Sequence, residues 1–363
     1  MSIQANIRFS RKLDADFNKT LRKRVNQYFS ENNLSKKGNF FMYLKTTVMI
    51  GLYIVPFIIL LTGVVSNPWA MLALAATMGF GVAGIGLSVM HDANHGAYSN
   101  KKWVNTMIGH TLNFLGGNAF NWKVQHNTLH HTYTNIDGYD EDLETIPLLR
   151  FSPHAKRYWV HRFQYIYAWC FYGLMTLSWT LMKDFRQFYT YSKKGLFKMH
   201  NSSLAKELPF LLLSKIGYYA IFLGLPMLLM DITFLQWFTG FMVMHFIAGL
   251  ILAMIFQPAH IVPENIFPKP DTKGNMEDNF LAHQMKTTLN FGNKNKVLNW
   301  YAGGLNFQIE HHLFPNVCHI HYSKLAPIVK QTAHEFDLPY HEIPSFSGAV
   351  IAHGKMLKQL GKA

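Results

Sequence analysis

Four long, almost uncharged apolar runs restrict what this chain can fold into. They cover residues 46–65, 69–90, 209–230 and 233–256, and Lys215 is the one charged residue inside them. A helix of about 20 residues is about 30 Å long, which matches the hydrocarbon core of a bilayer. The runs therefore predict four transmembrane helices and exclude an ordinary soluble domain.

The connections between the runs predict the topology. Residues 66–68 and 231–232 are short and contain no Lys or Arg, so the spans are expected to form two hairpins. Nearly all Lys and Arg lie in residues 1–45, 91–208 and 257–363, which the positive-inside rule places on the cytoplasmic side, together with both termini. The fold prediction is an all-α, multi-pass integral membrane protein with a cytoplasmic helical cap.

A further uncharged run, residues 163–182, is rich in Tyr and Trp, which prefer the interface between membrane and water. If this run crossed the membrane, residues 257–363 would lie on the opposite side from the other basic segments. We therefore expect it to lie in the interface or to be buried against the hairpins.

Composition divides the chain into a basic N-terminal segment (residues 1–45), a membrane domain (46–315) and a C-terminal cytoplasmic segment (316–363). The chain has 34 Lys and Arg against 20 Asp and Glu, a net charge of +14, and residues 1–45 contribute +7 of it. Such charge fits either an acidic protein partner or anionic lipid, and the sequence leaves both open. No nucleic-acid partner is expected.

Histidine is unusually frequent, with 19 copies, whereas two cysteines exclude a disulfide scaffold and a cysteine-ligated zinc or iron–sulfur site. Three polar groups lie on the predicted cytoplasmic side, close to the apolar runs: His91 and His95; His126, His130 and His131; Gln308, His311 and His312. Positions i, i+3 and i+4 share one face of a helix, so each group can offer imidazole ligands to a metal ion. Seven histidines exceed what one ion with an open position can use, and we predict two metal ions.

These groups resemble the three histidine boxes of membrane fatty acid desaturases: His91-Asp92-Ala93-Asn94-His95, His126-Asn127-Thr128-Leu129-His130-His131 and Gln308-Ile309-Glu310-His311-His312. The resemblance extends over residues 46–315 and includes the number of spans, the order of the boxes and their spacing. A third box that begins with Gln308 is similar to that of the front-end subgroup, which includes linoleoyl-CoA desaturases. Many front-end members carry a fused cytochrome-b5-type domain, but residues 1–45 are too few for one and no His-Pro-Gly-Gly motif occurs.

The resemblance implies two iron ions and a further histidine ligand before the third box. His283 matches that position, and Asn279, four residues earlier, matches a polar residue that reaches the metal through water. Gln308 is expected to contact a metal directly or through water. Since ligating imidazoles usually donate their other N–H to a carboxylate, four acidic residues in or near the boxes are expected to orient them: Asp92, Glu310, Asp140 and Asp142.

The predicted function is O₂-dependent desaturation of a fatty acyl chain, which introduces a cis double bond on the carboxyl side of an existing one. The acyl group is carried by CoA or by a membrane lipid, and two electrons per turnover come from a separate ferredoxin-like or cytochrome-b5-like protein. No general base is needed, because an acyl C–H bond is inert to acid and base chemistry.

Two alternative functions remain open from the sequence: one is an enzyme with a different reaction, and the other is not an enzyme. A di-iron fatty acyl hydroxylase of the same superfamily would insert oxygen rather than remove the second hydrogen. A histidine-rich metal transporter would place its ligands at mid-membrane, whereas only His245 lies within a predicted span.

Overall fold

The computed structural model describes residues 7–10, 15–144 and 146–362, and the chain is mostly helical within them. It divides into two compact units. The polar unit comprises residues 1–37, 127–168 and 255–363, and the span unit comprises residues 38–126 and 169–254. Arg11 and Lys12 of the basic N-terminal segment lie outside the described residues.

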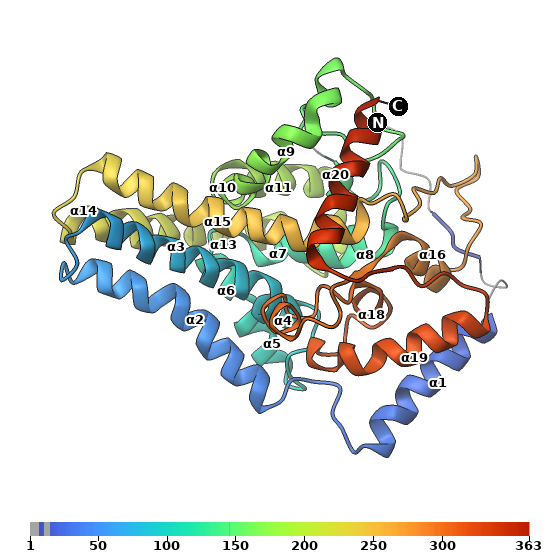
Figure 1. The fold of residues 1–363 in the computed structure, drawn as a ribbon. Helices are drawn as coiled ribbons and strands as arrows, with labels where there is room; N and C mark the ends of the chain where they lie inside the picture. Colours follow the sequence, from blue (N-terminus) through green and yellow to red (C-terminus); the bar gives the residue numbers. More distant parts are fainter. Residues whose placement is uncertain (1–6, 11–14, 145, 363) are drawn as a thin grey trace. The chain divides into compact units, whose positions relative to one another are not determined.

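Four helices of the described chain are long and apolar enough to cross a membrane: Phe40–Leu61, Pro68–Asn94, Leu204–Leu229 and Phe234–His260. They coincide with the four predicted runs, and the first begins six residues earlier than the sequence suggested. Their constituent segments, in chain order, are α2 (Phe40–Leu61), α3 (Pro68–Gly84), η1 (Ile85–Val89), α4 (Met90–Asn94), α13 (Leu204–Tyr219), η6 (Ala220–Gly224), α14 (Leu225–Leu229) and α15 (Phe234–His260). Figure 1 shows the long helices of the span unit running alongside one another.

Asparagine caps begin two of these helices. The Asn39 side chain accepts hydrogen bonds from the backbone N–H groups of Phe41 and Met42, at 3.0 and 3.3 Å, and so starts α2. Asn67 caps α3 in the same way, and Pro68 occupies the first helical position, where its missing N–H costs nothing. The short connection at residues 66–68 therefore leads directly into the second span.

The aromatic run at residues 163–182 is broken into short helices and is not among the candidate spans of the described chain. Its later part packs against α15 within the span unit, where the Thr176 hydroxyl donates to the His245 carbonyl at 2.8 Å. The segments concerned are α9 (Gln164–Gly173), α10 (Met175–Ser178), η5 (Trp179–Lys183) and α11 (Asp184–Lys193). Of the two expectations for this run, burial against a span holds for the part around Thr176.

The remaining helices of the span unit are short and precede or follow the spans. They are α5 (Lys102–Gly109), α6 (Thr111–Phe114), α7 (Ala119–Trp122) and α12 (Leu196–Met199). The segment η2 (Lys123–His130) passes from the span unit into the polar unit.

The polar unit has its own hydrophobic core, built largely by α1 (Ala15–Glu31) and α19 (Tyr322–Glu335). The two helices lie side by side (Figure 1), and Phe17, Leu21 and Val25 of α1 are buried in this core. Strands β1 (Asn290–Phe291) and β2 (Glu342–Ile343) pair in parallel. The other helices are α8 (His131–Tyr133), η3 (Glu141–Leu143), η4 (Trp159–Phe163), α16 (Phe280–Thr287), α17 (Lys296–Tyr301), α18 (Gln308–Leu313), η7 (His319–His321) and α20 (Phe346–Lys362).

Candidate metal centre

In the span unit, the first box meets the start of the second. His91 lies on α4, His95 follows one turn later, and His126 comes from η2. One ligand nitrogen from each of the three lies within 4.8 Å of the others. The Nε2 atoms of His91 and His126 face each other at 3.1 Å. Three imidazoles thus converge in a way that can hold one metal ion.

Trp122 holds this group from one side. Its indole stacks on the imidazole of His126, with ring centroids 4.4 Å apart and planes 29° apart. The edges of His91 and His95 approach the same indole at 5.4 and 5.7 Å. Trp122 therefore packs against all three imidazoles and restricts how far they can rotate.

Both boxes of this group adjoin a π-helical segment. η1 directly precedes α4, and η2 contains His126 and His130. A π-helix has i→i+5 hydrogen bonds and a wider turn than an α-helix, so the α-helical spacing assumed for the second box does not apply to it. π-Helical turns within α-helices are frequent at functional sites.

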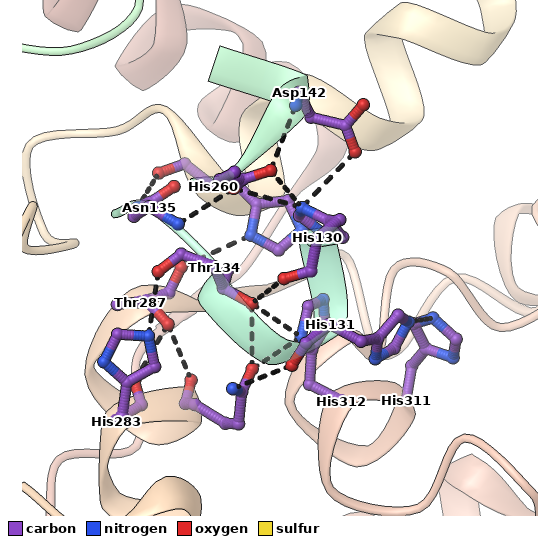
Figure 2. Close-up of polar contacts among 12 residues, drawn as sticks. His130, His131, Thr134, Asn135, Asp142, His260, His283, Thr287, His311 and His312 are labelled. Carbon is purple, nitrogen blue, oxygen red and sulfur yellow. Dashed lines mark hydrogen bonds and ion pairs between the residues drawn. The ribbon is translucent and has the colours of Figure 1, made fainter. Parts of the chain in front are cut away.

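In the polar unit, five histidines form two overlapping groups. His130, His260 and His312 bring ligand nitrogens within 4.8 Å of one another, and His131 and His311 do so together with the same His312. Figure 2 shows these side chains meeting from η2, α8, α15 and α18. The Nε2 atoms of His131 and His311 lie 2.9 Å apart.

The outer ring nitrogens of this group are held by polar side chains. The Nδ1–H of His130 donates to Asp140 at 3.1 Å, and Asp142 lies 3.3 Å from the same nitrogen. Burial lowers the pKa of His130, but the two carboxylates outweigh it and raise the pKa above its ordinary value. The Nδ1–H of His312 donates to the side-chain amide oxygen (Oε1) of Gln284 at 2.8 Å. These contacts leave Nε2 of each ring as the nitrogen for a metal ion.

His260 belongs to this group although it is not among the ligands predicted from the sequence. It is the last residue of α15, and its Nδ1–H donates to the Thr287 carbonyl at 3.3 Å. No second histidine lies at helical spacing from His260 along the chain, and that spacing is the pattern by which the boxes were predicted. In the sequence, His260 lies four residues after the end of an apolar run, whereas His91 directly follows one, so its position alone did not indicate a ligand.

His283 lies on α16 and is not part of the histidine groups found among the described residues, in either the span unit or the polar unit. Its Nε2–H donates to the Thr134 carbonyl at 2.9 Å, and burial lowers its pKa to about 4. Asn279 is the N-cap of α16, and its side-chain oxygen accepts from the N–H groups of Leu281 and Ala282. In this arrangement the predicted ligand His283 bonds to backbone, and Asn279 serves the helix start.

The remaining predicted residues are buried close to the boxes. The side chain of Gln308, the first residue of α18, lies beside His260. Glu310 accepts hydrogen bonds from Asn290 and Tyr340, at 2.8 and 2.9 Å, so its carboxylate braces α18. Burial raises the pKa of Glu310 to about 7, although both hydrogen bonds lower it. Asp92 is buried directly after His91.

Comparison with known proteins identifies the family. The profile of the family described as "Fatty acid desaturase" matches residues 67–344. The chain belongs to the fatty acid desaturase family. It is 35% identical over 349 residues to the sn-1 linoleoyl-lipid 6-desaturase of Arthrospira platensis, covering 95% of this chain and 92% of that one.

Two further relatives extend the comparison. The desaturase is 34% identical to the sn-1 linoleoyl-lipid 6-desaturase of a Synechocystis species, over 98% of each chain. It is 32% identical to an acyl-lipid (8-3)-desaturase of Physcomitrium patens, covering 99% of this chain and 74% of that one. With its four apolar helices, this protein is an integral membrane acyl desaturase, an oxidoreductase.

Proposed function

We propose that this desaturase introduces a cis double bond into the acyl chain of a membrane lipid, on the carboxyl side of an existing double bond. The names of its relatives, linoleoyl-lipid 6-desaturase and acyl-lipid (8-3)-desaturase, support this regiochemistry and the lipid carrier. The third box supports it too, since it begins with Gln308. The sequence alone left CoA and lipid equally open as carriers.

We assign one iron ion to each of the two histidine groups. In the span unit the ligands are His91, His95 and His126. In the polar unit the ligands are His130, His131, His260, His311 and His312. Facing Nε2 pairs at 2.9 and 3.1 Å suit a metal ion, because two imidazoles can share at most one proton in such a contact.

Iron supplies the chemistry that side chains lack, since it activates O₂ to remove two hydrogens from an unactivated methylene pair. The chain's own residues orient the ligands. Asp140 and Gln284 accept the Nδ1 protons of His130 and His312, which fixes each ring tautomer with Nε2 turned inward. The burial of these rings keeps bulk water from the site.

An apolar cavity of about 330 Å³ in the span unit is the proposed place for the methyl end of the acyl chain. Its walls include Phe57, Ala75, Met78 and Met244. Met78 lies 13 residues before His91 on one continuous helix, which corresponds to about 20 Å. A long acyl chain with its reacting carbons near His91 spans a distance of this order.

We propose that the four spans form two hairpins with both termini and the histidine boxes on the cytoplasmic side. The support is the distribution of Lys and Arg, which are absent from residues 66–68 and 231–232. Reporter fusions to the two ends of the chain test it. Reporters that respond on opposite sides of the membrane would contradict the topology.

The function is tested by product analysis. The chain is expressed in a host whose lipids contain linoleoyl groups and no endogenous front-end activity, and new double bonds are located by mass spectrometry. The expected product carries one additional cis double bond nearer the carboxyl group. A hydroxylated acyl chain as the main product would establish the hydroxylase alternative instead.

A further inference from the structure

One basic surface lies on α1. Its solvent-exposed side carries Lys19, Arg22 and Lys23, followed by the exposed amides Asn26 and Gln27. α1 buries its apolar residues against α19 and exposes no large apolar side chain. Its outer face is therefore polar and mainly cationic, with the exposed carboxylates of Asp16 and Glu31 near its two ends.

A second basic surface lies on α11 and differs in one respect. Arg186, Lys193 and Lys194 are exposed there, but so are Phe185 and Tyr189, at 41% and 63% of their surface. Cations beside exposed aromatic side chains fit the interface of a membrane, where the rings enter the headgroup region. The α1 face lacks the apolar component, so it fits a water-soluble acidic partner better than lipid.

α1 is also joined to the third box by direct contacts within the polar unit. The ring of Phe29, at the end of α1, lies 5.0 Å from the ring of His321. Next to it in sequence, the Tyr322 hydroxyl lies 3.3 Å from Nδ1 of His311. The backbone N–H of Cys318 donates to the Lys36 carbonyl at 2.8 Å. The chain after α1 is thus tied to the segment that follows the third box.

We propose that the α1 face formed by Lys19, Arg22 and Lys23 docks an acidic one-electron carrier protein, and that electrons enter the metal centre on the side of His311. This inference rests on the proposed function. Two carriers are each oxidised by one electron per turnover. With two protons from solvent and two hydrogens from the acyl chain, one O₂ is reduced to two waters.

Arg24 is excluded from this face because it is already paired. Its guanidinium donates to Glu335 at 2.7 Å and to Thr332 at 3.0 Å, which fastens α1 to α19. Replacing Arg24 would therefore disturb the fold as well as the charge. The other three cations project from the exposed side of α1.

The test compares two triple variants in neutral detergent, where lipid charge is absent. One carries Lys19→Gln, Arg22→Gln and Lys23→Gln, and the control carries Arg186→Gln, Lys193→Gln and Lys194→Gln. Binding of a plant-type [2Fe–2S] ferredoxin and of soluble cytochrome b5 is measured with metal-free protein. The α1 variant should bind its preferred carrier about tenfold more weakly at about 0.05 M salt, and the difference should shrink at about 0.5 M salt. The control should bind like the unmodified protein.

A second pair of measurements separates the possible failures. Reduction by dithionite, followed by O₂ and one turnover of product formation, should be equal in the α1 variant and the unmodified protein. If dithionite yields no desaturated product from the unmodified protein, the proposed function fails. If both carriers bind the α1 variant normally, the docking proposal fails. Binding of the α1 variant to vesicles containing phosphatidylglycerol is measured as well. If the variant binds these vesicles more weakly but binds both carriers normally, the α1 face is assigned to lipid and the proposal is overturned.

Discussion

The imidazoles of His260 and His312 lie 4.9 Å apart between ring centroids, at an angle of 61°. One ring comes from the end of the last span and the other from the third box, 52 residues later in the chain. His130 completes the group, with its ring 4.7 Å from that of His260. The end of a membrane helix is thus built into the candidate metal centre.

Replacing His260 should therefore remove metal. His260→Ala is expected to lose about one of two iron ions per chain, because it removes an imidazole nitrogen from a group of converging ligands. His283→Ala should retain both ions, since its Nε2–H is used by the Thr134 carbonyl. Iron content per folded chain, measured by mass spectrometry on purified protein, checks both variants. Iron loss in the His283 variant alone would restore the assignment suggested by family resemblance.

The span positions and part of the histidine clustering could be predicted from the sequence, for physical reasons. An apolar run must be about 20 residues long to cross a bilayer, and imidazoles at i and i+4 must share a helix face. Both rules act over short stretches of chain. The four candidate spans, and the clustering of His91 with His95 and of His311 with His312, follow from them.

His260 and Asn279 depended on tertiary structure instead. His260 reaches the box histidines only through the fold of the polar unit, and no local pattern encodes that. Asn279 resembled a metal contact, yet an Asn directly before a helical run is also a common N-cap, and the cap uses its side-chain oxygen. The π-helical form of η2 could not be predicted either, because the predicted spacing of the second box assumed an α-helix.

Asp140 should tune metal affinity without binding the metal itself. Asp140→Asn keeps the size of the side chain but removes the charge that holds the Nδ1–H of His130 at 3.1 Å. Iron affinity is expected to fall about 10- to 100-fold, the usual effect of losing such a partner. Competition with a chelator of known affinity measures this. The control Glu144→Gln, at an exposed position of the same loop, should leave affinity unchanged; equal affinities for all three proteins would argue against the role of Asp140.

The apolar cavity should set the length of chain that is accepted. Ala75 lines it and is buried, so Ala75→Phe should fill part of the space without altering any histidine. We expect the variant to lose activity on long acyl chains and to keep it on chains several carbons shorter. Competition between lipids of two chain lengths measures the ratio of products. An unchanged ratio would place the methyl end elsewhere.

Acid should destabilise the polar unit through His353. Its Nδ1–H donates to the Ile261 carbonyl at 2.8 Å, directly after His260, and burial lowers its pKa to about 4. In the unfolded chain the pKa is about 6.5, so between these values the unfolded state binds more protons than the folded one. The contribution of His353 to the free energy of unfolding should therefore fall by about 1.4 kcal/mol per pH unit as pH drops from about 6.5 to about 4, and no further below that.

The variant His353→Gln should reduce the slope by this contribution, because Gln does not titrate, while His283, whose pKa burial also lowers to about 4, keeps its own contribution. Thermal unfolding in detergent, followed from pH 7 to pH 4, measures it, with the exposed His334→Gln as the matched control. A slope that is unchanged in the His353 variant and reduced in the control would assign the acid sensitivity to the surface.

A buried ion pair should stabilise the span unit. Lys215, inside the third span, donates to the Asp184 carboxylate and to the carbonyls of Gly116 and Trp179, each at 2.6 Å. Its three ammonium protons thus match three acceptors. Removing one partner of a buried pair usually costs about 3–5 kcal/mol, because the other charge is left without compensation.

Lys215→Met should therefore lower the unfolding temperature strongly, and adding Asp184→Asn should recover part of the loss. Recovery should be incomplete, since two carbonyls still lack their donor, at about 1–3 kcal/mol each. Thermal unfolding of the single and double variants measures this, with Lys206→Met, at an exposed position of α13, as the control. If the double variant is as unstable as the single one, the uncompensated charge is not the cause, and the lost hydrogen bonds to the two carbonyls account for the whole effect.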